Sequence, residues 1–284
     1  MRTAWTELPG QLQAAIKDRA GRIRALQPAT RGNHADFAST LHTSDGRVFV
    51  KAARKVSTDV DGPEVRALRW EAAINPYVAE LAPRLLWRAE AGEWLALGFE
   101  HVAGRHADYS PGSPDLAALD RVIRTLQETV TPEVVKGRVE RRWTLADVDV
   151  SGAAGDVLLH TDINADNLLI TPDERVYLVD WAFVARGAAW VELGLMIPWL
   201  IKAGHSPSRA AAWAERFPAW NRADSAAIDA FSMALAQCWR VRCEHNQAEW
   251  VAERAALTRQ WAEHRLRGRE VNGVGEKPSG VSWA

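Results

Sequence analysis

The sequence is poor in cysteine, nearly neutral and without long apolar runs. Its two cysteines, Cys238 and Cys243, lie five positions apart on an expected helix and so on different faces, which argues against a disulfide or a metal pair. A net charge of −1 argues against nonspecific binding to nucleic acid. No run approaches the roughly 20 apolar residues of a membrane span, and residues 1–10 lack a signal-peptide core. We therefore expect a soluble, cytoplasmic protein with neither nucleic-acid nor membrane partners.

The chain does contain enough apolar material for two lobes. It has 284 residues, of which 47% are hydrophobic, and a chain of this length suits more than one core. Over residues 1–100 the periodicity predicts a helix at 8–26, a hairpin of strands 38–43 and 47–51 with a turn at 44–46, a helix from residue 63, and strands at 83–87 and 94–99. The first lobe is thus expected to be a small, mostly antiparallel sheet with helices.

Helical spacing dominates residues 101–267. The expected helices cover 115–130, a segment from 188, 207–216 and 224–267, the last with a break near residues 244–246. Residues 268–284 are rich in glycine and polar side chains, which indicates a loosely ordered tail. The fold class is therefore α+β, with lobes at 1–100 and 101–267.

The residues that carry chemistry are concentrated in 158–181, where three apolar segments alternate with polar turns. Asp162 and Asn167 flank a tight loop, and Asp180 ends the strand that is expected to pair with the one after the loop. Phosphoryl transfer needs one carboxylate to orient the attacking hydroxyl, and an amide oxygen with a second carboxylate to hold Mg²⁺ against nucleotide phosphates. The alternative is a polar hairpin whose Asp and Asn only form turns; the flanking strands and the position of Asp180 favour the catalytic interpretation.

The spacing His-x-Asp-x-x-x-x-Asn, followed by Asp-Trp after a strand, resembles the aminoglycoside phosphotransferase family, which shares its architecture with choline and homoserine kinases. The resemblance rests on His160, Asp162, Asn167 and Asp180-Trp181. It implies a bilobal protein-kinase-like fold with a small antiparallel-sheet N-terminal lobe and a larger, mainly helical C-terminal lobe. By the same resemblance Asp162 is the catalytic base, and Asn167 and Asp180 are the Mg²⁺ ligands.

Two positions depart from the family pattern. Thr161 stands where the family usually has Gly, and a β-branched residue restricts the backbone more than Gly does. Glu192 stands where relatives commonly carry an Asp that braces the catalytic loop. Neither departure removes one of the three chemical groups.

Lys51 follows a hydrophobic strand, as the nucleotide-positioning lysine of kinases does, and is expected to contact the α- and β-phosphates of ATP or GTP. A solvated edge lysine is the alternative interpretation. The helix that begins at Gly62-Pro63 carries two candidate partners for its ammonium group. Glu71 lies two turns into this helix and is assigned the ion pair, while Glu64 is assigned a role at the helix N-terminus.

The remaining nucleotide contacts expected from the kinase-like architecture involve backbone groups. The carbonyl of Glu100 and the amide of Val102 follow the last strand of the first lobe and would hydrogen-bond the edge of the adenine. Gly32 lies in a loop that could fold over the phosphates, although an ordinary turn explains a single Gly equally well.

Three other functions compete with an antibiotic kinase. A protein kinase is disfavoured because no Arg precedes Asp162 and no Ala-Pro-Glu segment follows Asp180. A metabolite kinase of the choline or homoserine kind fits the same motif, and a nucleotide-binding protein without catalysis is a third possibility. The acceptor that we favour is a cationic aminoglycoside or related antibiotic. Carboxylates that could attract it, or could instead pair with interleaved arginines on a helix surface, are Asp224, Asp229, Glu244, Glu249, Glu253 and Glu263.

Overall fold

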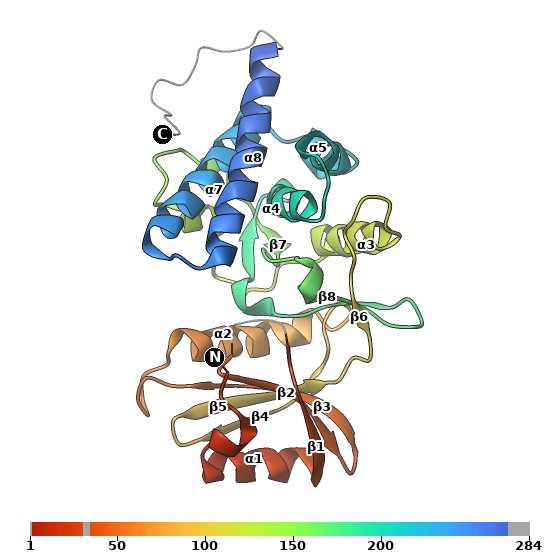
Figure 1. The fold of residues 1–284 in the computed structure, drawn as a ribbon, viewed down its shortest axis with the longest axis vertical. Helices are drawn as coiled ribbons and strands as arrows, with labels where there is room; N and C mark the ends of the chain where they lie inside the picture. The colour runs from red at the N-terminus through yellow and green to blue at the C-terminus, as the bar shows by residue number, and fades with distance from the viewer. Residues whose placement is uncertain (1, 31–34, 272–284) are drawn as a thin grey trace. The chain divides into compact units, whose positions relative to one another are not determined.

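The computed structural model describes residues 2–30 and 35–271, and Figure 1 shows its elements in chain order. The expected phosphate-loop residue Gly32 lies outside the described residues. The described chain forms two compact units. The first contains residues up to 108, 113–137 and 158–185, and the second contains 109–112, 138–157 and the chain from 186 onward. The lobe boundary after residue 100 stays a prediction.

A five-stranded antiparallel sheet forms the centre of the first unit (Figure 1). Its order is β1-β2-β3-β5-β4. The strands are β1 (Ile23–Pro28), β2 (Phe37–Thr43), β3 (Gly46–Arg54), β4 (Leu85–Ala91) and β5 (Trp94–Glu100). Four of these strands occupy the regions expected from alternating hydrophobicity, and the β2–β3 hairpin turns at Ser44 and Asp45.

The helix expected over residues 8–26 is wrong beyond Ala20. Helix α1 covers Gly10–Ala20, and Gly21 ends it with a positive φ of 81°. A Cβ atom at Gly21 would lie 2.8 Å from a carboxylate oxygen of Asp45, so the position requires glycine. The chain then enters β1, which contains Ile23 and Leu26. Their separation of three positions is typical of a helix, and in the strand a register irregularity lies between Ile23 and Ala25.

Alternating side chains of the sheet build two cores on its opposite faces. On one face Leu12 and Ile16 of α1 pack with a cluster that includes Trp94 and Ala96 of β5. On the other face α2 (Pro63–Ile74) packs Val65 and Leu68 against a second cluster, which includes Leu95, Leu97 and Phe99 of the same strand. Figure 1 shows α1 and α2 on opposite sides of the sheet. The period of two along β5 therefore fixes which residues support each helix.

A small sheet of order β6-β8-β9 completes the first unit and carries the polar motif. Its strands are β6 (Arg105–His106), β8 (Leu168–Ile170) and β9 (Val176–Leu178), and helix α3 (Asp115–Glu128) belongs to the same unit. The β8–β9 hairpin pairs Leu168 with Leu178. Asn167 immediately precedes one strand and Asp180 closely follows the other, so the hairpin brings the two residues to the same end.

The second unit is mainly helical. Its helices are α4 (Trp190–Lys202), α5 (Pro207–Ala214), α6 (Pro218–Asn221), α7 (Ser225–His245) and α8 (Glu249–Val271). The break expected near residues 244–246 separates α7 from α8. Phe231 is fully buried and contacts the rings of Trp143, Trp190 and Trp261, which are core residues.

Short elements connect these parts. Strands β7 (Val157–Leu159) and β10 (Ala185–Gly187) lie where the chain passes between the two units, and 3₁₀ helices cover Trp5–Glu7, Asn75–Tyr77, Val139–Trp143, Ser151–Ala153, Ala165–Asn167 and Trp181–Phe183. Helix α8 continues four residues into the segment expected to be a tail, and 272–284 lie outside the described residues. Within residues 2–30 and 35–271, no helix combines the length and apolarity needed to cross a bilayer.

Candidate active site

The loop after β7 holds Asp162 and Asn167 against each other. The Asn167 amide nitrogen donates to the backbone carbonyl of Asp162 at 2.9 Å and to its carboxylate Oδ2 at 3.0 Å. Asn167 is buried at the end of the 3₁₀ helix η5 (Ala165–Asn167), whose first turn is capped by the Asn164 side chain. Because the nitrogen bonds Asp162, the amide oxygen is the Asn167 atom that can bind a metal ion.

Thr161 adopts the left-handed backbone conformation, with φ of 69°. A non-glycine residue there costs about 1–2 kcal/mol, because its Cβ approaches the following carbonyl oxygen. The Thr161 hydroxyl donates to the backbone carbonyl of Phe183 at 2.7 Å, an interaction that glycine cannot make. The departure from the family pattern thus adds a hydrogen bond between the catalytic loop and the segment after Asp180, which offsets part of the backbone strain.

His160 joins the same two segments from inside the protein. Its Nδ1 accepts the backbone N–H of Asp162 at 3.3 Å, so Nε2 carries the proton and donates to the Val179 carbonyl at 3.1 Å. The ring also contacts Trp181 edge to face at 4.8 Å. Burial lowers the pKa of His160 to about 4, against the opposing effect of the Asp180 carboxylate. His160 is therefore a neutral, structural residue rather than an acid or base.

This buried histidine predicts a loss of stability in mild acid. The folded-state pKa of about 4 lies below the ordinary 6.5, so the unfolded chain binds more protons between these values. The contribution of neutral His160 to stability is fully present above pH 6.5. As the pH falls from 6.5 through 4, the free energy of unfolding decreases by roughly 3 kcal/mol. Urea unfolding of wild type and His160→Gln between pH 4.5 and 7 should give a shallower pH slope for the variant. His245→Gln, at an exposed histidine, is the control; identical slopes for all three proteins would contradict the assignment.

Lys51 lies between two carboxylates. Its ammonium group contacts both carboxylate oxygens of Glu71 at 2.9 Å and Oδ1 of Asp180 at 3.3 Å. The expected pairing with Glu71 is therefore present, and Glu64 lies in the first turn of α2. Asp180 has a left-handed backbone, with φ of 66°, which turns the chain directly after β9. Asp tolerates this conformation better than most residues do.

The electrostatics of this cluster follow from its burial. Burial alone lowers the pKa of Lys51, but the carboxylates of Asp180 and Glu71 outweigh it and raise the pKa above its ordinary value. Burial raises the pKa of Glu71, and the Lys51 ammonium opposes this change. One cation between two carboxylates leaves a net negative charge, which suits a site that receives a divalent cation.

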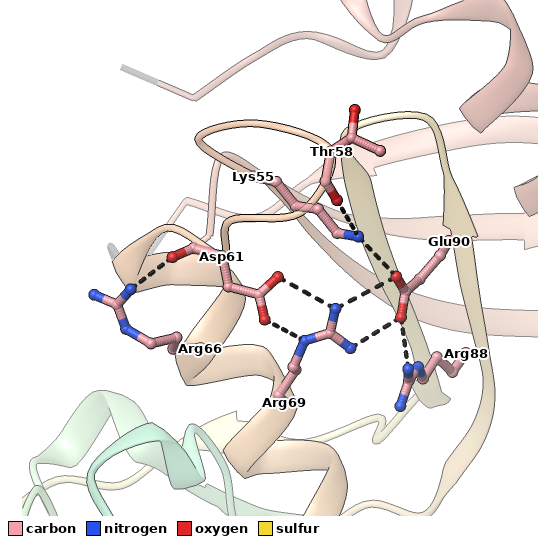
Figure 2. A network of polar contacts seen from close by, with 7 residues as sticks. All are labelled: Lys55, Thr58, Asp61, Arg66, Arg69, Arg88 and Glu90. Carbon is pink, nitrogen blue, oxygen red and sulfur yellow. Dashed lines mark hydrogen bonds and ion pairs between the residues drawn. The ribbon is translucent and has the colours of Figure 1, made fainter.

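A salt-bridge network holds the start of α2, the helix that carries Glu71 (Figure 2). Arg69 contacts Asp61 at 2.5 Å and Glu90 of β4 at 2.9 Å, and Lys55 contacts Glu90 at 3.0 Å. The hydrogen bond from Arg69 lowers the pKa of Glu90. The network ties the loop before α2 and the helix itself to the edge strand of the sheet, and so restricts the orientation from which Glu71 reaches Lys51.

A cavity of about 290 Å³ within the first unit unites most of the predicted site residues. Its lining includes Lys51, Glu71, Glu100, Val102, Asn167 and Asp180. Asp162 is absent from the lining but is hydrogen-bonded to Asn167, which lines the cavity. Phe49 and Phe99 supply apolar walls near Glu100, as a planar base requires. Arg2 also lines the cavity; no motif pointed to it, because it lies far from the catalytic segments in sequence.

The donor set fits Mg²⁺. No group of three or more His, Cys, Asp or Glu suited to a metal occurs in the described part of the chain. The amide oxygen of Asn167 and the carboxylate of Asp180 nevertheless supply two hard oxygen donors beside the cavity. Mg²⁺ commonly takes only one or two protein carboxylates, with phosphate oxygens and water as its other ligands. A Mg²⁺ site of this kind therefore does not require three His, Cys, Asp or Glu side chains to lie together.

Other sequence predictions have different outcomes. Glu192 is buried in the second unit near Arg142, whose pKa burial lowers and Glu192 raises; its role toward the catalytic loop stays a prediction. The carboxylates of 224–267 are largely engaged within the second unit. Asp224 caps α7, and Asp229, Glu244, Glu253 and Glu263 contact Arg265, Arg240, Lys202 and Arg259, respectively. Pairing with arginines at helical spacing, the alternative interpretation, therefore accounts for Glu244 and Glu263, whereas Asp229 forms a buried ion pair.

Comparison with known proteins agrees with this geometry. Residues 128–231 match the model of a phosphotransferase enzyme family, and this segment contains the candidate residues Asp162, Asn167 and Asp180. The match confirms the resemblance that the motif indicated. No match to a curated protein sequence was found.

Several solved structures share the fold. The apo form of a thermostable mutant of aminoglycoside phosphotransferase APH(4)-Ia has a TM-score of 0.60 and 13% identity, over 93% of this chain and 99% of that chain. Choline kinase LicA from Streptococcus pneumoniae has a TM-score of 0.60 and 12% identity, over 90% and 98%. Spectinomycin phosphotransferase APH(9)-Ia, in complex with ADP and spectinomycin, has a TM-score of 0.56 and 12% identity, over 89% and 93%. The α+β, kinase-like fold is thereby confirmed, and the family match supports the class of small-molecule kinases.

Proposed function

We propose that this protein is a Mg²⁺-dependent O-phosphotransferase that transfers the γ-phosphoryl group of ATP or GTP to a small hydroxylated molecule. The observation that carries the proposal is the set of contacts that joins Asp162 to Asn167 and Lys51 to Glu71 and Asp180. These groups come from four separate segments of one unit, and their chemistry is the set that phosphoryl transfer uses.

Each side chain has a proposed role. Asp162 accepts and orients the acceptor hydroxyl, and Lys51, held by Glu71, positions the α- and β-phosphates. Asn167 and Asp180 hold Mg²⁺, which when bound neutralises charge on the phosphates. Glu100 and Val102 line the cavity, and their backbone carbonyl and amide, respectively, contact the adenine or guanine ring. The hydrogen bond from the Asn167 amide nitrogen to the Asp162 carboxylate fixes the distance between the catalytic base, Asp162, and the metal ligand, Asn167.

For the acceptor we favour a cationic, hydroxyl-rich compound of the aminoglycoside type, with phosphorylation conferring resistance. The family resemblance and the structural similarity to a spectinomycin phosphotransferase support this choice. The carboxylates on α7 and α8 add little, because most have partners of their own. The acceptor class therefore depends on the family comparison.

A choline-type metabolite kinase is the second candidate, since choline kinase LicA has the same TM-score as the aminoglycoside enzyme. Tryptophan faces could bind a quaternary amine through cation–π attraction. In the second unit, however, the faces of Trp199 and Trp239 already lie 3.9 and 5.9 Å from the guanidinium of Arg254. This pair therefore gives choline no additional support.

The acceptor is tested by a screen that couples nucleotide consumption to a spectroscopic signal. Aminoglycosides are compared with choline, homoserine and simple sugars, with ATP or GTP, at two salt concentrations. We expect turnover with a cationic antibiotic and a KM that rises with salt, because screening weakens the capture of a cation. Turnover only with an uncharged or anionic metabolite would overturn the antibiotic assignment but leave the kinase chemistry intact. Nucleotide binding without turnover on any acceptor would favour a non-catalytic protein.

A further inference from the structure

Arg2 enters the cavity from a segment that belongs to none of the motifs. Its guanidinium donates a hydrogen bond from Nη1 to the backbone carbonyl of Ala29, which also lines the cavity. The next residue anchors the segment, because the Thr3 amide donates to the Asp36 carbonyl at 2.7 Å. Arg2 is therefore held beside the cavity by its own side chain and by the backbone of the residue that follows it.

Arg2 also interacts electrostatically with Asp180, the proposed Mg²⁺ ligand. Asp180 lines the same cavity as Arg2. Burial lowers the pKa of Arg2, and the Asp180 carboxylate opposes this change. The other cation there is Lys51, which contacts both Glu71 and Asp180. Because these two carboxylates outweigh the charge of Lys51, the cluster alone provides no excess positive charge for a nucleotide triphosphate.

We propose that Arg2 is a phosphate-binding residue for the donor nucleotide, acting beside Lys51. The inference rests on the proposed function and extends it by one residue. A guanidinium has five N–H donors in a fixed plane, so it can hold a backbone carbonyl and a phosphate oxygen at the same time. Arg2 thus adds positive charge to a cluster in which Glu71 and Asp180 neutralise the charge of Lys51.

A purely structural role for Arg2 makes a different prediction from phosphate binding. If Arg2 only supports the backbone at Ala29, its loss should weaken binding of adenosine and ADP alike, since the whole cavity wall would change. If Arg2 binds the phosphates, adenosine binding should be unaffected and the loss should appear only when phosphates are present. Arg2→Lys should retain part of the affinity for ADP, because lysine keeps the charge but not the planar guanidinium.

The experiment is calorimetric titration of wild type, Arg2→Gln and Arg2→Lys with adenosine, ADP and ATP, with and without Mg²⁺. We expect Arg2→Gln to weaken ADP and ATP binding roughly ten- to hundredfold, the range for a charge-assisted hydrogen bond, with adenosine unchanged. Arg24→Gln removes the same charge from an exposed position on β1 and serves as the control. Thermal unfolding of each variant establishes that it is folded.

The outcomes separate this inference from the proposed function. If Arg2→Gln binds ADP as tightly as wild type does, the role of Arg2 is overturned. An equal loss of affinity for adenosine and ADP also overturns it. Either result leaves the kinase proposal intact. An equal loss in Arg24→Gln would indicate a general charge effect and also overturns it. Absence of ADP and ATP binding by wild type overturns both proposals. Nucleotide binding that depends on Arg2, without phosphorylation of any acceptor, upholds the inference and contradicts only the catalytic function.

Discussion

Replacement of Asp162 by asparagine is expected to lower turnover by roughly 10²- to 10⁴-fold, the range for loss of a general base. The substitution keeps the size of the side chain and its contact distance to Asn167, but removes the negative charge that would accept the hydroxyl proton. Nucleotide affinity should change little, because Asp162 does not line the cavity that Lys51, Asn167 and Asp180 line. Steady-state kinetics with a coupled assay, together with titration of nucleotide, measures both quantities.

The matched control is Asp173→Asn, which removes an exposed carboxylate from the turn between β8 and β9. It changes the net charge equally and should leave turnover near that of wild type. Near-normal turnover in Asp162→Asn would remove the residue from the chemistry. A large loss of nucleotide affinity in that variant would instead indicate that the Asp162–Asn167 contact supports the metal site.

Asp180→Asn is expected to weaken binding of Mg²⁺-nucleotide by roughly a hundredfold or more, since even the outer partners of a metal contribute 10- to 100-fold to its affinity. Asparagine keeps the size of the side chain and tolerates the left-handed conformation at φ of 66°. Metal-free nucleotide should bind as well as before or more tightly, because Lys51 then loses one of the two carboxylates that compete with phosphate. Calorimetric titrations with Mg²⁺ and with a chelator measure the two affinities.

Lys51→Met provides the opposite comparison for the same cavity. It should weaken binding with and without Mg²⁺, because the positive charge serves the phosphates directly. If Asp180→Asn reduced both affinities equally, Asp180 would act through Lys51 and the fold of the site rather than as a metal ligand. The ratio of the two affinities is therefore the decisive quantity.

The elements that the sequence predicted correctly are those whose signal is local. The β2–β3 hairpin, the break between α7 and α8 and the segment around Asp162 have side-chain spacings that a short stretch of chain determines. The order His160, Asp162, Asn167 constrains one loop and two short strands, so few conformations satisfy it. By contrast, the spacing of Ile23 and Leu26 favours a helix, and only pairing with β2 makes this segment the strand β1.

Tertiary structure alone decided which charges meet. Lys51 and Asp180 are 129 positions apart, yet their side chains come within 3.3 Å, and nothing in either local segment encodes that distance. Arg2 reaches the cavity because backbone pairing at Thr3 and Asp36 places it there, and Asp229 is removed from any ligand role by Arg265. The sequence by itself determined the type of chemistry that we propose, because the candidate groups Asp162, Asn167 and Asp180 lie within one short segment. Only the fold determined their partners, because ion pairing depends on separation in space and not along the chain.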